Sequence, residues 1–136
     1  MKKLLLLSIF ATLIQAETYL CIETTFLSIR DGKTIETIPA KPNFSGMQLV
    51  ISDTKIESNK YRVNDWEKFD GYFLNIEPSS DKNVIVATTV LSYEERLIGI
   101  NTKTGDMMEC IYDTKDTIKG IVDTERRTLY KCELQK

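Results

Sequence analysis

The chain has 136 residues, with 18 basic and 20 acidic side chains, no histidine and a formal net charge of −2. That length predicts one domain. A weakly acidic composition without a block of cations excludes nucleic acid as an expected partner, because phosphate binding requires clustered lysine and arginine.

Residues 1–16 predict a secretory signal peptide. They combine a basic start at Lys2 and Lys3, an apolar run over 4–14 and the small residue Ala16. The run is too short to cross a bilayer, which takes about 20 apolar residues. Cleavage after Ala16 leaves residues 17–136 and removes two lysines, so the mature net charge is expected to be 16 − 20 = −4.

The signal peptide predicts a periplasmic or secreted protein. Lipid attachment would require a small residue before the cysteine, whereas the bulky Leu20 precedes Cys21. We therefore expect no stable membrane anchor after the signal peptide is removed.

Residues 17–136 predict a single all-β domain. Segments rich in β-branched and aromatic residues alternate with turn signals such as Asp31-Gly32 and Thr104-Gly105. A single helical turn is expected near 64–69 or 93–96. The expected strands cover 17–29, 33–38, 47–51, 56–63, 72–76, 84–91, 97–100, 107–112, 118–123 and 128–134. About eight to ten short strands predict a small antiparallel β-barrel or β-sandwich.

Three cysteines, Cys21, Cys110 and Cys132, predict at least one disulfide in an oxidising compartment. If the last three strands form a meander, Cys110 and Cys132 lie on its outer strands, about 9.6 Å apart. A disulfide requires Cα atoms within about 7 Å. If the sheet closes so that its first strand meets its last, Cys21–Cys132 is the expected disulfide. Cys21–Cys110 is the fallback.

The residue types argue against an enzyme. Without histidine there is no Ser-His-Asp triad, no Cys-His pair and no histidine-ligated metal. No CxxC pair or D-x-[DN]-x-[DN]-G calcium loop occurs either. Matches to S-x-x-K at 52–55 and 79–82, and to K-T-G at 103–105, fall in predicted turns. We expect no catalytic site, no metal site and no cofactor.

A hydrolase that uses paired carboxylates is a third, less favoured interpretation. Glycosidic cleavage needs two carboxyl groups on either side of a cleft. Nothing in the spacing of the acidic side chains singles out such a pair. The candidates are Glu94, Glu95, Asp106, Glu109, Asp113 and Asp116.

Five aromatic residues fall within 13 positions, between Tyr61 and Phe73. In a barrel or sandwich such residues commonly fill the core. The polar residues and the glycine between them also fit an exposed loop, where aromatic side chains supply much of the energy of protein binding. Trp66, Phe69 and Tyr72 are the candidate partner-binding residues.

These observations predict an exported, non-catalytic binding protein that recognises another protein. An inhibitor-type module acting on a basic secreted enzyme suits the acidic net charge. The alternative is a carrier that holds a small apolar ligand inside a β-barrel. In architecture alone, this outline resembles bacterial lysozyme-inhibitor barrels and lipocalin-like carriers.

Overall fold

The computed structural model describes residues 16–30, 33–39, 45–62, 65–92, 94–113 and 124–136. Residues 1–15 of the predicted signal peptide and the predicted strand at 118–123 lie outside the described residues. The described part of the chain is all-β and contains no helix. Its strands are β1 (Glu17–Arg30), β2 (Lys33–Pro39), β3 (Gly46–Ile51), β4 (Lys55–Arg62), β5 (Glu67–Glu77), β6 (Val84–Leu91), β7 (Glu94–Asn101), β8 (Asp106–Asp113) and β9 (Thr124–Gln135).

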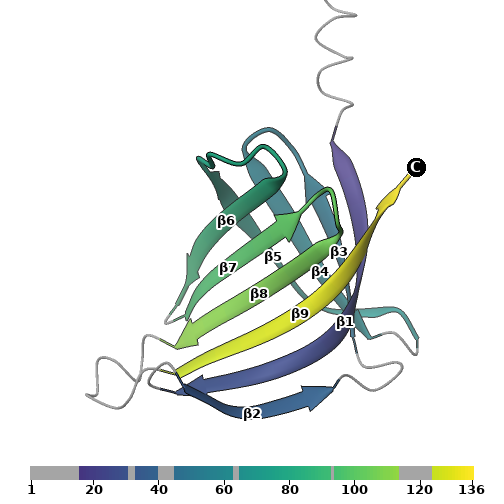
Figure 1. Ribbon diagram of the computed structural model, residues 1–136. Coiled ribbons are helices and arrows are strands. Elements are labelled where there is room, and N and C mark those ends of the chain that lie inside the picture. Colours follow the sequence, from purple (N-terminus) through teal and green to yellow (C-terminus); the bar gives the residue numbers. More distant parts are fainter. Residues whose placement is uncertain (1–15, 31–32, 40–44, 63–64, 93, 114–123) are drawn as a thin grey trace, which may run out of the picture.

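Eight strands form a closed antiparallel barrel, which decides between the predicted barrel and sandwich (Figure 1). The order around the barrel is β1-β3-β4-β5-β6-β7-β8-β9, and β9 returns to pair with β1. β2 is a ninth strand outside the closed ring and pairs with β1. Closure leaves few free edges, which are sites of unwanted strand pairing in open sheets.

β1 is long enough to pair with three other strands. One of its edges pairs with β3 over Glu17–Ile22 and then with β2 over Thr25–Arg30. Its other edge pairs with β9 from Thr18 to Arg30. The strand therefore both closes the barrel and carries β2.

The helical turn expected near 64–69 or 93–96 is corrected by the structure. Residues 65–66 form a turn, Glu67 starts β5 and Glu94 starts β7, so 67–69 and 94–96 are strand. Pairing decides this conformation: Tyr61 lies opposite Lys68, and Arg96 lies opposite Ile111. A ladder of backbone hydrogen bonds to a neighbouring strand outweighs the weak helical tendency of so short a segment.

The predicted disulfide between Cys21 and Cys132 is confirmed. The two residues lie directly opposite each other in the register of β1 and β9, and their side chains are buried inside the barrel. Cys110 is the free, buried cysteine. Such a bond is compatible with an oxidising environment.

The meander that led to this prediction is not the arrangement in the structure. β8 pairs directly with β9, with Cys110 opposite Arg127. Cys110 is therefore kept from Cys132 by position along the strand, not by an intervening strand. The expected closure of β1 on β9 is confirmed.

Gly105, at the end of the β7–β8 turn, has a positive φ of 83°. A side chain here would collide with the backbone of Cys132, whose N–H donates to the Gly105 carbonyl oxygen at 2.7 Å. The turn glycine thus fits both the left-handed backbone and close packing against β9.

Apolar side chains fill one end of the barrel, which we call the closed end. It carries the β3–β4 and β7–β8 turns and the first residues of β1. The largest fully buried apolar side chains are Met47, Leu49, Ile56, Leu74, Ile98 and Ile100. We call the opposite end, where β4 ends and β5 and β7 begin, the mouth.

Removing the disulfide is expected to destabilise the fold without changing it. The bond closes a loop with a sequence separation of 111, which the chain-entropy model values at about 4 to 5 kcal/mol of unfolding free energy. Denaturant unfolding of wild type and of the Cys21→Ala/Cys132→Ala double variant measures this loss.

Reductant provides the control for that experiment. It should lower the stability of wild type toward that of the double variant and leave the double variant unchanged. Equal stability of oxidised wild type and double variant would contradict the expectation.

Candidate functional site: the charged mouth of the barrel

On β1, β4, β5 and β7, the side chains that face the barrel interior change from uncharged to charged. The same change occurs on strands that run in opposite directions, so it follows the barrel axis. From the closed end to the mouth, the interior positions are Ile56, Ser58 and Lys60 on β4; Leu74, Tyr72 and Asp70 on β5; Ile100, Ile98, Arg96 and Glu94 on β7; and Tyr19, Cys21 and Glu23 on β1.

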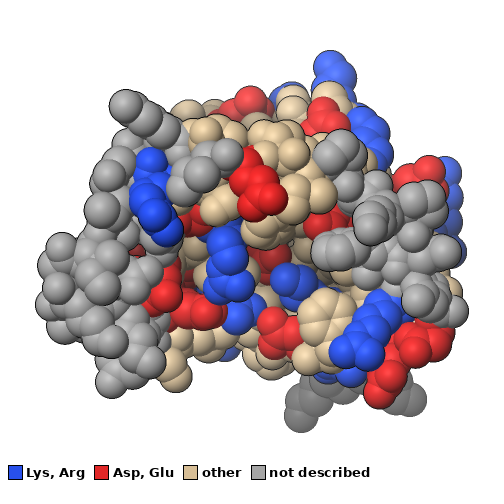
Figure 2. Space-filling view, turned by 90° about the horizontal axis from the view of Figure 1, so that it is seen from below, with Lys and Arg blue, Asp and Glu red and all other residues tan. Residues whose placement is uncertain are grey.

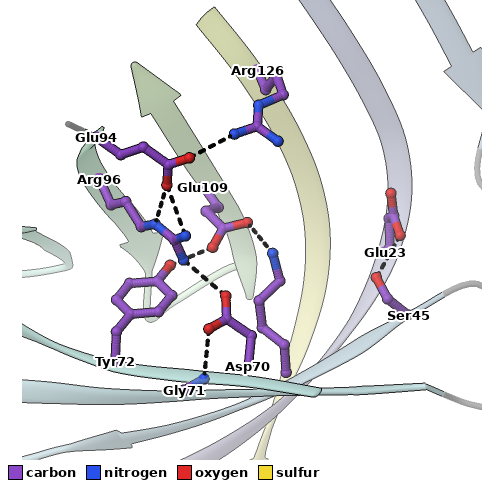
Figure 3. Close-up of polar contacts among 10 residues, drawn as sticks. Glu23, Ser45, Asp70, Gly71, Tyr72, Glu94, Arg96, Glu109 and Arg126 are labelled. Atoms are coloured by element: carbon purple, nitrogen blue, oxygen red, sulfur yellow. Dashed lines mark hydrogen bonds and ion pairs between the residues drawn. The ribbon is translucent and has the colours of Figure 1, made fainter. Parts of the chain in front are cut away.

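Seven ionisable side chains from six strands converge there, and we call them the mouth cluster. They are Glu23, Lys60, Asp70, Glu94, Arg96, Glu109 and Arg126. Seen along the barrel axis, the mouth is hollowed, with basic and acidic side chains side by side inside it (Figure 2). A close-up shows most of these side chains pointing toward one another (Figure 3).

Glu109 on β8 is the deepest member of the mouth cluster, with 1% of its surface exposed. Its Oε1 accepts a hydrogen bond from Lys60 Nζ at 2.9 Å, and its Oε2 accepts one from the Tyr72 hydroxyl. Burial and the neighbouring Glu109 carboxylate raise the pKa of Tyr72. Tyr72 therefore stays protonated and donates to Glu109.

Arg96 on β7 connects three other groups. Its Nη1 donates to Asp70 Oδ2 at 2.9 Å, and its Nη2 donates to Glu94 Oε2 at 2.8 Å. Its guanidinium carbon lies 4.6 Å from the centre of the Tyr72 ring, a cation–π contact. Burial opposes the charge, but the hydrogen bonds to Asp70 and Glu94 raise the pKa of Arg96.

Asp70 and Glu94 extend the hydrogen-bond network of Arg96 toward solvent. Burial opposes ionisation of Asp70, but its hydrogen bond from Arg96 holds its pKa below the ordinary value. Asp70 Oδ1 also accepts the Gly71 N–H at 2.9 Å. Glu94 Oε1 accepts a hydrogen bond from Arg126 on β9 at 3.2 Å.

Glu23 on β1 is a second buried carboxyl group in the interior. Ser45 Oγ donates to its Oε2 at 2.5 Å. Burial raises the pKa of Glu23; the Ser45 hydrogen bond and the charge of Lys60 act in the opposite direction, while Glu109 raises it further. Lys60 therefore acts on Glu23 and Asp70 as well as on Glu109.

The mouth cluster has three cations and four carboxyl groups, and each cation already contacts a carboxylate. The arrangement can orient a polar or basic group that enters the mouth. It offers no unpaired cation to an anion.

The structure separates the three predicted partner-binding aromatics. Trp66 and Phe69 are each 49% exposed and belong to the β4–β5 connection and the start of β5, at the mouth. Tyr72 is 5% exposed and belongs to the mouth cluster. Trp66 adopts a left-handed φ of 56°, and its N–H donates to the carbonyl oxygen of Arg62. The Arg62 guanidinium carbon lies 5.9 Å from the Phe69 ring centre.

The candidate carboxylates do not form one site. Glu94 and Glu109 belong to the mouth cluster, whereas Asp106 lies at the closed end and pairs with Lys131 at 3.0 Å. Glu95 is exposed on the outer surface. Asp113 ends β8. Asp116 lies outside the described residues.

Sequence reasoning missed Glu23, Lys60, Asp70 and Arg96 as members of a site. A usable signal was present, because each occupies the inward position that follows the uncharged inward positions of its strand in the direction of the mouth. Recognising it requires the strand register, since period-two alternation alone does not say which ends of the strands meet.

No protein-family model, curated protein or solved structure matches this chain. Among the described residues, no helix has the length and apolar character needed to cross a membrane. The same residues contain no cluster of three or more cysteine, aspartate or glutamate side chains placed to hold a metal ion.

The Lys60–Glu109 pair gives a stability prediction. Lys60→Met leaves the Glu109 carboxylate buried without its cation and is expected to cost about 3 kcal/mol of unfolding free energy. The double variant Lys60→Met/Glu109→Gln removes both charges and is expected to recover most of that loss. Denaturant unfolding of the two single variants and the double variant measures the coupling; strictly additive losses would contradict the pairing.

Glu23 gives a prediction about pH. Because its folded-state pKa is raised, the protonated carboxyl group stabilises the fold below the unfolded-state pKa, and this contribution is lost as pH rises through the folded-state pKa. Glu23→Gln keeps a neutral group at every pH. Its stability relative to wild type should therefore increase from about pH 4 to about pH 8.

The exposed substitution Glu133→Gln is the matched control, measured by the same denaturant unfolding. It should show little change between the two pH values. A Glu23→Gln effect that is constant, or that decreases toward high pH, would be inconsistent with a raised pKa.

Proposed function

We propose that the protein is an exported, non-catalytic binding protein whose mouth receives part of another protein. The observation that carries this proposal is the convergence of the mouth cluster and two half-exposed aromatic side chains, Trp66 and Phe69, at one end of the barrel. Large aromatic side chains surrounded by ordered polar groups are typical of the centres of protein interfaces.

The free-energy cost of burying the charges of the mouth cluster supports a role beyond folding. Removing charged groups from water is unfavourable, and apolar side chains of similar size often stabilise a protein as well or better. Here they hold one another in fixed positions, as Arg96 does for Asp70 and Glu94. A rigid polar surface of this kind binds with little loss of side-chain freedom.

The exposure of the cluster favours a basic partner. The side chains of Asp70 and Glu94 are 36% and 31% exposed, whereas the cations of Lys60 and Arg96 are at most 14% exposed. Arg126 is the exposed cation of the cluster. A lysine or arginine side chain of a partner can therefore approach the two carboxylates near the rim.

The disulfide supports export to the periplasm or the exterior of the cell, where such bonds persist. The two alternative functions have less support. An apolar ligand would meet a charged mouth and a closed end filled by side chains. A carboxylate hydrolase would require free carboxyl groups, but Glu109 and Glu94 are occupied by Lys60, Tyr72 and Arg96.

The test is affinity capture from an envelope extract at low salt, followed by affinity measurements with the purified partner. Trp66→Ala is expected to weaken binding by about 30-fold, the effect of an interface residue worth about 2 kcal/mol. Asp70→Asn should weaken it less and reduce its dependence on salt.

Leu134→Ala, at an exposed apolar residue near the closed end, is the matched control and should leave affinity unchanged. Binding that survives both mouth substitutions, or an extract that yields no partner, would count against the proposal.

A further inference from the structure

The barrel wall is incomplete between β5 and β6. These strands pair only over Asn75–Glu77 on β5, whereas β6 and β7 pair from Val84 to Leu91. Toward the mouth, the β5 residues before Asn75 pair with β4 but not with β6. We call this unpaired stretch the seam.

Arg96 closes the seam from inside. It extends from β7 across the seam to Asp70 on β5, and Asp70 accepts the Gly71 N–H. The Ile76 N–H donates to the carbonyl oxygen of Thr54, on the β4 side of the strand. Successive residues of a strand direct their backbone groups to opposite sides, so every second residue, counted from the neighbours of Ile76, faces β6. The backbone groups of Phe73 therefore point into the seam, where β6 does not pair with them.

A groove of about 410 Å³ lies beside the seam. That volume is within the range of ligand sites. Its lining combines the apolar side chains Val90, Leu97 and Tyr112 with the polar Asn75, Thr88 and Thr89 and the charged Glu95 and Arg96.

Two features of the groove indicate what would occupy it. Val90 is 65% exposed and Tyr112 is 37% exposed, although both lie on strands. Glu95 is exposed, and among the described residues it forms no ion pair. The cation nearest to it in sequence, Arg96, is already engaged by Asp70 and Glu94.

We propose that the groove binds an extended, basic segment of a partner protein, which adds as a strand to the free edge of β5. Its backbone pairs with Phe73, an apolar side chain packs on Val90 of β6, and a lysine or arginine side chain reaches Glu95, which lies opposite Val90 on β7. An unpaired strand edge is a template for such addition; its backbone bonds supply affinity and its neighbouring side chains supply selectivity. This site shares Arg96 with the mouth cluster, but it does not depend on the mouth binding a partner.

The probe for the test is a short fluorescein-labelled valine–lysine peptide of Val-Ser-Lys-Ser repeats, in which valine and lysine lie on the same face of an extended strand, and the readout is fluorescence anisotropy with the full-length protein. The valine–lysine peptide is expected to bind. The same peptide with glutamate in place of lysine, and the valine–lysine peptide with N-methylated backbone amides, should each bind at least about 10-fold more weakly, because they lose the charge and backbone contacts respectively.

Variants of the protein complete the test. Glu95→Gln should weaken binding of the valine–lysine peptide several-fold, and Val90→Ser should weaken it as well. The exposed substitution Glu133→Gln is the matched control for charge, and Trp66→Ala reports on the mouth; both should leave peptide affinity unchanged. Equal binding of the N-methylated peptide, equal affinity in Glu95→Gln and Glu133→Gln, or no binding of the valine–lysine peptide would each overturn the proposal.

Discussion

Pairing of β1 with β9 is the contact on which the rest of the structure depends. It runs from Thr18 to Arg30 and turns an otherwise open sheet into a barrel, and the Cys21–Cys132 disulfide holds the two strands together at their inward faces. Once the sheet is closed, inward side chains reach solvent mainly through the ends of the barrel. The inward residues nearest each end therefore determine whether that end is apolar or charged.

This constraint explains why the charges of the mouth occur as a network. Glu109 is buried, and Lys60 and Tyr72 satisfy its carboxylate, which would otherwise lose its hydrogen bonds to solvent. Arg96 serves two purposes, because its contact with Asp70 both orders the mouth and spans the seam that the backbone leaves unpaired. Arg96 thus contributes both to the polar network of the interior and to the closure of the wall between β5 and β6.

The all-β fold could be predicted from sequence because its signals are local, whereas the disulfide followed only on the assumption that the first strand meets the last. β-branched runs, the glycine turns and the position of Cys132 in the last strand are read from neighbouring residues. The start of β5 was missed, because Lys68, Asp70 and Gly71 resemble a loop until the strand is paired with β4. The mouth cluster could not be predicted, since its members come from six strands that closure alone brings together. Tyr72 was singled out as a possible surface residue because the sequence did not show that it points inward.

Site-specific photo-crosslinking tests the central claim, that the mouth is the recognition surface, most directly. A photoreactive phenylalanine derivative replaces Trp66 at the mouth or, in a second protein, Leu134 near the closed end; both native side chains are substantially exposed. After illumination in envelope extract at low salt, the account predicts a covalent adduct with one partner protein from position 66 and none from position 134. Adducts from position 134 alone, or equal adducts from both positions, would contradict it.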